Sequence, residues 1–207
     1  MPGPHDAMIA NAAKGALYPL GFRRKGRSRL WLLDCAWWLA VVEFQPSGWA
    51  KGSYLNVAAH WLWSEHEFLS FDVCNRVGGF AEYASDAQFA SAALELADSA
   101  AIEAARLRER FSSIDATADD LVAEETATKR SLGSWSRYNA GVAAGLVGRS
   151  AKAAALLCGV TDHRVKPSAG TMARLANDQA LFRKKTADLI ARQRLALGLP
   201  PIDDLRF

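Results

Sequence analysis

The fold is decided by the stretch WWLAVVEFQPSGWAKGSYLNVAAHW, which spans residues 37–61. It contains two runs of alternating apolar residues, 37–45 and 53–61, separated by the turn-forming sequence Pro46-Ser47-Gly48. Side chains of a strand point alternately to the two faces of its sheet. The stretch therefore predicts two antiparallel strands that share one apolar face.

The two faces of these strands differ in chemistry. The apolar face carries the predicted core, which consists of Trp38, Ala40, Val42, Phe44, Leu55, Val57, Ala59 and Trp61. The opposite face carries Val41, Glu43, Gln45, Tyr54, Asn56 and His60. This polar sheet face is the first candidate site, either as a surface for a ligand or partner or as a buried hydrogen-bond network that orients the strands.

A helix and a further β-rich run precede this stretch. The helix begins at His5 or Asp6 and extends to about Tyr18, where Pro19 stops it. The β-rich run covers residues 22–33. Because the connections between the three β-rich runs are short, they favour an antiparallel meander.

From Ser85 onward, apolar residues recur every three or four positions, which is typical of amphipathic helices. The first helix is long, and its apolar stripe consists of Phe89, Ala93, Leu96, Ala97, Ala100, Ala104, Leu107, Phe111 and Ile114. Thr117 and Asp120 have the spacing of a capping box, which predicts a second helix that ends at about Leu132.

Three more helices are expected towards the C-terminus. Two of them cover residues 135–146 and about 150–158, and glycines 141, 145 and 148 favour their close packing. The last helix covers residues 171–197, after a hinge at 165–170.

The fold class predicted from this pattern is α+β: an N-terminal helix on a short antiparallel sheet, followed by an α-helical C-terminal region. Residues 1–133 are expected to form the α+β domain, and residues 134–207 a helical extension that packs on it. The composition, 50% hydrophobic and 23% charged over 207 residues, is typical of an ordered globular chain.

The sequence predicts a cytoplasmic protein with no membrane partner. The most apolar stretch, residues 30–44, contains Asp34 and is shorter than the roughly 20 residues that a membrane-spanning helix needs. The N-terminus lacks a basic start followed by an apolar run. Cys35, Cys74 and Cys158 lie far apart in the sequence, which favours reduced thiols.

Charge is distributed unevenly along the chain. Residues 1–60 hold 7 basic and 3 acidic residues, residues 61–133 hold 6 and 14, and residues 134–207 hold 12 and 5. Basic segments of this kind bind nucleic acid in some proteins, and in others they pair with acidic segments of the same fold. The densest basic run is Arg23, Arg24, Lys25, Arg27 and Arg29. It would hold an anion or a nucleic-acid backbone, or else protect a sheet edge.

No motif predicts a reaction or a cofactor. The residues with metal-ligand chemistry are His60, Glu65, His66, Glu67 and Asp72, and their spacing matches no zinc motif, so no metal is predicted. A third hypothesis is an enzyme that uses His60 or His66 as its acid or base. It ranks below the binding hypotheses, because the spacing of the sequence places no carboxylate beside either histidine.

Three segments resemble a bacterial domain-of-unknown-function family, number 4304. They are Gly21-Phe22-Arg23-Arg24-Lys25-Gly26-Arg27, Phe44-Gln45-Pro46-Ser47 and Tyr54-Leu55-Asn56-Val57. The resemblance covers roughly residues 5–130 and departs from the family pattern at Pro46 and Ser53. It implies an α+β domain with no assigned activity. The residues that carry it include polar positions of the predicted sheet face.

The leading hypothesis is a non-catalytic binding module whose partner is an unidentified protein or a small anionic ligand. The candidate site residues are Arg24, Lys25, Arg27, Gln45, Tyr54, Asn56 and His60. Trp49 and Trp63, in expected loops, are further candidates for partner contact. The alternative is nucleic-acid binding through residues 23–29 and the basic C-terminal helix, which predicts a steep dependence on salt.

Overall fold

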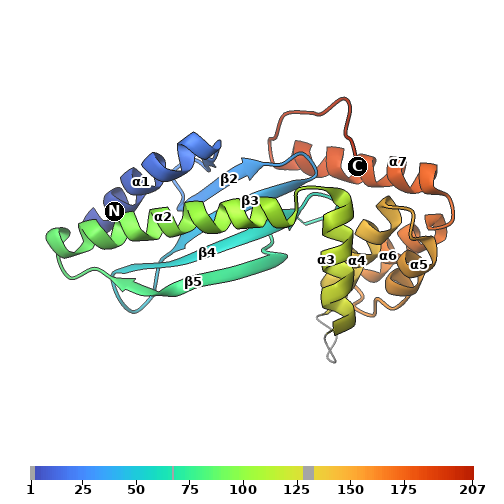
Figure 1. Cartoon of the computed structure of the whole chain (residues 1–207), viewed down its shortest axis with the longest axis horizontal. Helices are drawn as coiled ribbons and strands as arrows, with labels where there is room; N and C mark the ends of the chain where they lie inside the picture. Colours follow the sequence, from blue (N-terminus) through green and yellow to red (C-terminus); the bar gives the residue numbers. More distant parts are fainter. Residues whose placement is uncertain (1–2, 67, 128–132) are drawn as a thin grey trace. The chain divides into compact units, whose positions relative to one another are not determined.

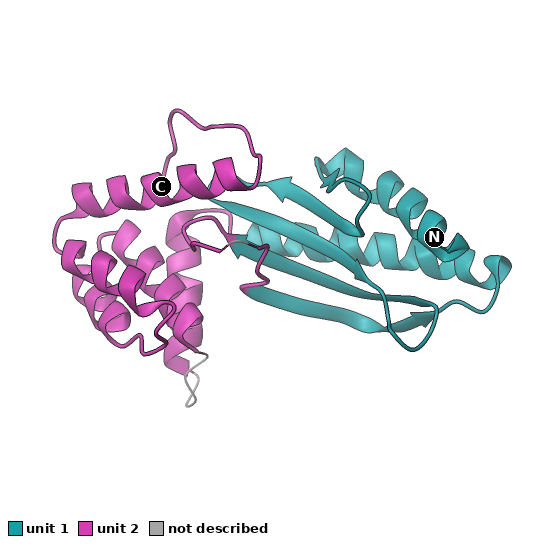
Figure 2. Ribbon diagram, turned by 180° about the vertical axis from the view of Figure 1, so that it is seen from behind, with its two compact units in different colours: residues 1–60, 73–109 teal, residues 61–72, 110–207 magenta. Residues whose placement is uncertain are grey.

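The computed structural model describes residues 3–66, 68–127 and 133–207, and it has the predicted mixed α+β fold (Figure 1). Within these residues the chain forms a five-stranded antiparallel sheet and seven α-helices. It divides into two compact units, residues 1–60 with 73–109 and residues 61–72 with 110–207 (Figure 2).

This division differs from the boundary expected after residue 133. The helix that precedes that boundary packs against the helix that follows it, so the two belong to the same unit. The connection formed by residues 61–72, inside the sheet region of the sequence, also belongs to the second unit. The spacing of residues along the sequence reveals neither the packing of these two helices nor the unit to which residues 61–72 belong.

The first unit contains the sheet and two helices. Its elements are α1 (Pro4–Leu17), the 3-10 helix η1 (Tyr18–Leu20), β1 (Arg23–Arg24), β2 (Leu30–Asp34), β3 (Trp38–Gln45), β4 (Gly52–Trp61), β5 (Val73–Glu82) and α2 (Asp86–Arg110). The strands follow one another in the order β1-β2-β3-β4-β5, which confirms the meander. The α1 helix confirms the predicted N-terminal helix.

Alternation located the core of the sheet correctly. Every residue of the predicted apolar face of β3 and β4 is buried. The prediction for the opposite face was right for only part of its length. Glu43, Gln45 and Tyr54 keep some exposure there, whereas Val41 and His60 are fully buried.

The β5 strand was not predicted. None of its ten residues is buried, so it shows no apolar alternation, and it contains Gly78 and Gly79. Ser53 pairs with Ala81 and Leu55 with Val77, so residues 78–80 lie opposite a single residue of β4. This is a β-bulge, and Gly78 provides its left-handed backbone with φ +66°.

The long α2 helix confirms the predicted apolar stripe from Phe89 to Leu107, all of which is buried. The helix ends at Arg110, earlier than the stripe suggested. Phe111 and Ile114 continue the apolar spacing but belong to the second unit, where both are buried.

The second unit is helical. Its helices are α3 (Ile114–Ala127), α4 (Ser134–Leu146), α5 (Ser150–Cys158), α6 (Lys166–Leu175) and α7 (Gln179–Ala196). No helix within the described residues is both long enough and apolar enough to span a lipid bilayer.

Two predicted helix boundaries were wrong. The hydroxyl of Ser113 accepts the Ala116 N–H at 3.1 Å, so α3 begins before Thr117, whose own hydroxyl is buried and donates to the Ser113 carbonyl. The predicted end at Leu132 lies outside the described residues.

The helix predicted for residues 171–197 is two helices in the structure, because the Asp178 side chain accepts the Leu181 N–H at 3.0 Å and starts α7. The expected hinge at 165–170 therefore forms the start of α6.

Close helix packing at two glycines was predicted correctly. A Cβ atom on Gly141 would lie 2.7 Å from Leu157 Cγ of α5. A Cβ atom on Gly145 would overlap the ring of Phe182 in α7. Both distances are shorter than van der Waals contact, so the two helices reach α4 only because these side chains are missing.

Candidate functional site

Asn56 is the centre of a polar cluster that we define as Glu43, Gln45, Tyr54, Asn56 and Arg76. Its side-chain amide is only 6% exposed and donates to Glu43 Oε2 at 2.9 Å and to Gln45 Oε1 at 3.0 Å. Its carbonyl oxygen accepts from Arg76 Nε at 3.2 Å. One amide on β4 thus connects β3 to β5.

Arg76 is the exposed group that this cluster holds in place. Its Nη2 donates to Gln45 Oε1 at 2.6 Å, and its guanidinium carbon lies 4.4 Å from the centre of the Tyr54 ring. The Tyr54 ring in turn lies 4.9 Å from the Phe80 ring. Hydrogen bonds and a cation–π contact therefore fix the guanidinium in one orientation before anything binds.

Several polar atoms of the cluster remain available. Among the described residues, Gln45 Nε2 and the Tyr54 hydroxyl make no hydrogen bond, and Arg76 Nη1 donates to none. Gln45 and Tyr54 are half-buried, whereas Arg76 is exposed. The cluster thus has a buried amide, that of Asn56, at its centre. The more exposed Gln45, Tyr54 and Arg76 provide donors and acceptors that a partner can reach.

Trp49 lies at the same end of the sheet as Gln45 and Tyr54. It is 99% exposed in the β3–β4 turn, where the Ser47 hydroxyl accepts its backbone N–H at 3.1 Å. Its predicted exposure is thus confirmed. Trp63 is different: its indole is fully buried in the second unit and donates to Asn139 Oδ1 at 3.0 Å. The prediction for Trp63 was wrong because its loop packs inside that unit.

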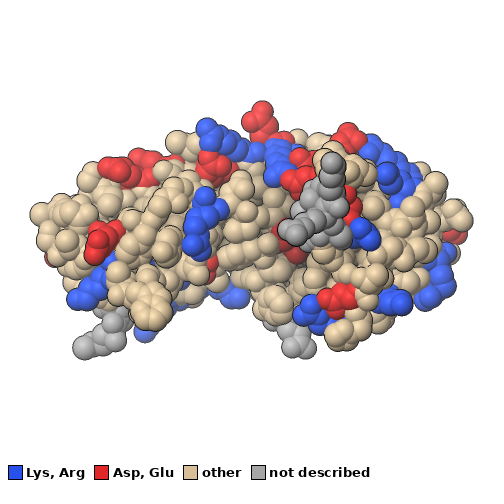
Figure 3. Space-filling model, turned by 90° about the horizontal axis from the view of Figure 1, so that it is seen from below, with Lys and Arg blue, Asp and Glu red and all other residues tan. Residues whose placement is uncertain are grey.

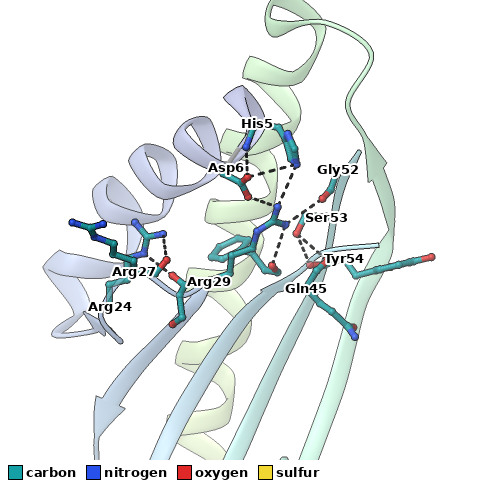
Figure 4. Close-up of polar contacts among 12 residues, drawn as sticks. His5, Asp6, Arg24, Arg27, Arg29, Gln45, Gly52, Ser53 and Tyr54 are labelled. Atoms are coloured by element: carbon teal, nitrogen blue, oxygen red, sulfur yellow. Dashed lines mark hydrogen bonds and ion pairs between the residues drawn. The ribbon is translucent and has the colours of Figure 1, made fainter. Parts of the chain in front are cut away.

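The structure does not bring Arg24, Lys25 and Arg27 to the polar cluster. They lie in the β1–β2 hairpin, and β2 and β3 separate β1 from β4 (Figure 4). Arg24 donates from Nε to the Ser28 carbonyl at 2.7 Å and from Nη2 to the Arg27 carbonyl at 3.1 Å. Arg24 therefore closes its own hairpin, while Lys25 and Arg27 are exposed.

Arg29, the last residue of the basic run, turns towards the protein. It forms an ion pair with Asp6, and its Nη1 donates to the Phe44 and Gly52 carbonyls at 3.5 and 3.3 Å (Figure 4). Its Nη2 lies 3.3 Å from His5 Nε2. Arg29 thus connects the first turn of α1 with the ends of β3 and β4, which is a structural role.

His60 also lies away from the cluster. It occupies the far end of β4 and is fully buried, because apolar residues surround that part of the strand. It therefore cannot contact a partner that docks near Gln45 and Tyr54.

His66 and Asp72 form a separate buried pair in the second unit. Asp72 accepts hydrogen bonds from the Trp61 N–H and the Ser70 hydroxyl, both at 2.9 Å, and burial raises the pKa of its carboxyl to about 6. His66 Nε2 lies 3.9 Å from Asp72 Oδ1, and burial lowers the pKa of His66. Both side chains are less than a tenth exposed, so the pair orders its own loop.

Glu65 and Glu67 were the other acidic residues with metal-ligand chemistry in this part of the sequence. Glu65 pairs with Arg192 at 3.0 Å, and Glu67 lies outside the described residues. Within the described part of the chain, no group of three or more His, Cys, Asp or Glu side chains is arranged to hold a metal ion.

Comparisons of the chain with protein-family models, with curated proteins and with solved structures find no match. The resemblance to family 4304 stays a prediction.

Proposed function

We propose that the protein is a non-catalytic binding module that docks a partner protein on the surface formed by Gln45, Trp49, Tyr54, Arg76 and Phe80. The observation that carries this proposal is the exposed Arg76 guanidinium, held over Tyr54 by Gln45 and Asn56. A side chain that is already ordered loses little conformational entropy when a partner binds it. Arginine, tyrosine and tryptophan are also the residues that dominate the energetics of protein interfaces.

A partner protein fits this surface better than a small anion. The carboxylate of Glu43 belongs to the same hydrogen-bond network as Arg76, so the cluster has no net positive charge. Trp49 adds a large exposed apolar side chain at the same end of the sheet, which a small polar anion would not use. We therefore expect a partner that offers an apolar contact to Trp49 and a hydrogen-bond acceptor to Arg76.

The nucleic-acid alternative has less support from the contacts. Three basic residues of the C-terminal third pair with acidic residues of the middle third: Arg137 with Glu125 at 2.8 Å, Arg149 with Asp119 at 2.6 Å, and Arg192 with Glu65 at 3.0 Å. On the face drawn in Figure 3, basic and acidic side chains are interspersed. These contacts favour internal charge pairing as the origin of the uneven charge distribution.

A site-specific photo-crosslinking experiment tests the proposal. A photoreactive phenylalanine derivative replaces Trp49 in one variant and Leu195, which is 81% exposed on α7, in the control. Irradiation in lysate of cells that make the protein should give a discrete adduct from position 49 only, at both low and moderate salt. Arg76→Ala, added to the first variant, should remove that adduct, while circular dichroism shows that the protein is still folded at the temperature of irradiation.

Three results would contradict the proposal. One is the same adducts from both positions, which would indicate non-specific contact. Another is the absence of any adduct from position 49. The third is an adduct that consists of nucleic acid and disappears at moderate salt, which would favour the alternative instead.

A further inference from the structure

The β5 strand forms an open edge of the sheet. It is the last strand in the order, and within the described residues its backbone pairs only with β4. An edge strand leaves alternate N–H and C=O groups without partners, and proteins block such edges with proline, with charged side chains, above all lysine, or with β-bulges. Residues 73–82 contain no proline and no lysine, and the bulge interrupts the regular strand only at 78–80, with 73–77 and 81–82 paired regularly to β4. This edge is therefore chemically able to pair with another strand.

A groove lies between the second half of β5 and α2. It has a volume of about 170 Å³, and five of its eight lining residues are small: Gly78, Gly79 and Ala81 from the strand, and Ala92 and Ser99 from the helix. Val77, Glu95 and Leu96 complete the lining. Among the described residues, and apart from the adjacent residues of the chain, no heavy atom lies within 4 Å of where a Cβ of Gly78 or Gly79 would be. The bulge and the small helix residues thus leave space for a side chain that comes from outside.

One charged residue, Glu95, is among those that line the groove, and it is acidic. Residues 77–105, which include the whole lining, contain no lysine or arginine. Glu95 lines the groove, is exposed, and accepts only the Ser91 hydroxyl, at 3.0 Å. Its charge has no basic partner among the described residues. Charge complementarity therefore selects a positively charged occupant.

We propose that the outer edge of β5 binds an extended basic peptide segment as a sixth strand, with a lysine or arginine side chain of that segment in the groove beside Glu95. Main-chain hydrogen bonds to the edge give affinity in this mode of recognition, and a pocket for alternate side chains gives specificity. The site goes beyond the function proposed above, because it uses the edge of the sheet and the α2 side, not the Trp49 surface.

A second copy of the chain fits this edge less well. Pairing β5 with β5 of another copy would bring two acidic α2 segments towards each other, and like charges oppose such an approach. Association of two copies is therefore an outcome that the experiment must be able to detect.

The experiment uses the whole protein and a synthetic peptide of alternating arginine and threonine with blocked ends. Amide hydrogen exchange should show new protection in residues 73–82 when this peptide is added. Two control peptides should give no protection: one has glutamate at every arginine position, and the other is N-methylated at alternate amides and cannot pair with the edge.

Matched charge reversals on α2 locate the binding site. Glu95→Arg should weaken peptide binding about tenfold, the change expected when one surface charge contact becomes repulsive. Asp98→Arg makes the same change on an exposed residue of the same helix that does not line the groove, and it should have a much smaller effect. Trp49→Ala should leave peptide binding intact, so this inference and the proposed function can fail separately.

Any of three outcomes overturns the inference. The first is a lack of new protection in β5 at peptide concentrations that saturate binding. The second is equal weakening by Glu95→Arg and Asp98→Arg, which would indicate a general effect of acidic charge. The third is a protein that sediments as a dimer, with β5 protected before any peptide is added.

Discussion

Replacing Asn56 with alanine is the sharpest test of the polar cluster. The side chain makes three hydrogen bonds, and two of them join it to charged groups, Glu43 and Arg76. A hydrogen bond to a charged group contributes about 1.5–3 kcal/mol when buried, and water can replace part of that here, because Arg76 is exposed. We therefore expect Asn56→Ala to lower the free energy of unfolding by about 2 kcal/mol.

Asn75 provides the matched control. It is an asparagine of the neighbouring strand, it is exposed, and among the described residues its side chain makes no hydrogen bond. Asn75→Ala should change the free energy of unfolding by no more than about 0.5 kcal/mol. Urea unfolding gives both values, and amide exchange in β3, β4 and β5 shows whether the loss is local to the sheet.

The result also separates the two interpretations of the polar sheet face. If Asn56→Ala unfolds within about 0.5 kcal/mol of the wild type, the network contributes little to stability and our account of it is wrong. If Asn56→Ala is destabilised as expected but stays folded, it can be combined with the photoreactive residue at position 49. Loss of the adduct from position 49 would then show that the ordered Arg76 matters for binding.

Three further predictions concern residues outside the cluster. Burial raises the pKa of Asp72 from 3.8 to about 6, so the folded protein holds this proton more tightly than the unfolded chain does, and the free energy of unfolding should fall by about 3 kcal/mol as pH rises through that window. Burial lowers the pKa of His66, so the contribution of His66 makes the free energy of unfolding rise with pH instead. Urea unfolding at a series of pH values should therefore be measured for the wild type and for Asp72→Asn, and the difference between the two curves gives the Asp72 contribution. Gly145→Ala should destabilise the protein by about 1–3 kcal/mol, because the new methyl group overlaps Phe182, and Phe182→Leu should relieve part of that loss in a double-mutant cycle measured by urea unfolding. Arg29→Ala should lower stability by about 1–3 kcal/mol and speed amide exchange in α1, whereas unchanged exchange there would contradict the role of Arg29 as an anchor.

The sequence predicted the centre of the sheet because two conditions held there. The β3 and β4 strands are long, and one face of each is entirely apolar, so a period of two is visible in the residues themselves. The same alternation placed Gln45, Tyr54 and Asn56 on one face. It could not show that Asn56 joins its neighbours, since that depends on the register between strands.

The β5 strand, and with it Arg76 and Phe80, escaped prediction for a physical reason. An edge strand with a bulge buries none of its residues, and its two glycines are typical of loops. The sequence of β5 therefore shows no alternation of apolar and polar residues that would predict a strand. The residue that makes the polar cluster a candidate site was therefore absent from the predicted set.

The basic run shows a different limit. From residue type, residues 23–29 were predicted to hold an anion or a nucleic-acid backbone, or to protect a sheet edge, and the partners that Arg24 and Arg29 have in the fold were not foreseen. Arg24 binds carbonyls of its own hairpin, and Arg29 binds α1 and the strand ends. Only the positions of α1 and β3 in space decide this, and local sequence does not contain them.

The end of β4 and the loop that follows it have a consequence for the protein while it is being made. Trp61, Leu62 and Trp63 are all fully buried in the second unit, and the Trp63 indole bonds to Asn139, 76 residues further along the chain. At synthesis rates of about 5–20 residues per second, the ribosome needs roughly 4–15 s to reach that partner. During this interval Trp61, Leu62 and Trp63 cannot yet be buried by the later part of the second unit. This segment is where a chaperone would be expected to bind first.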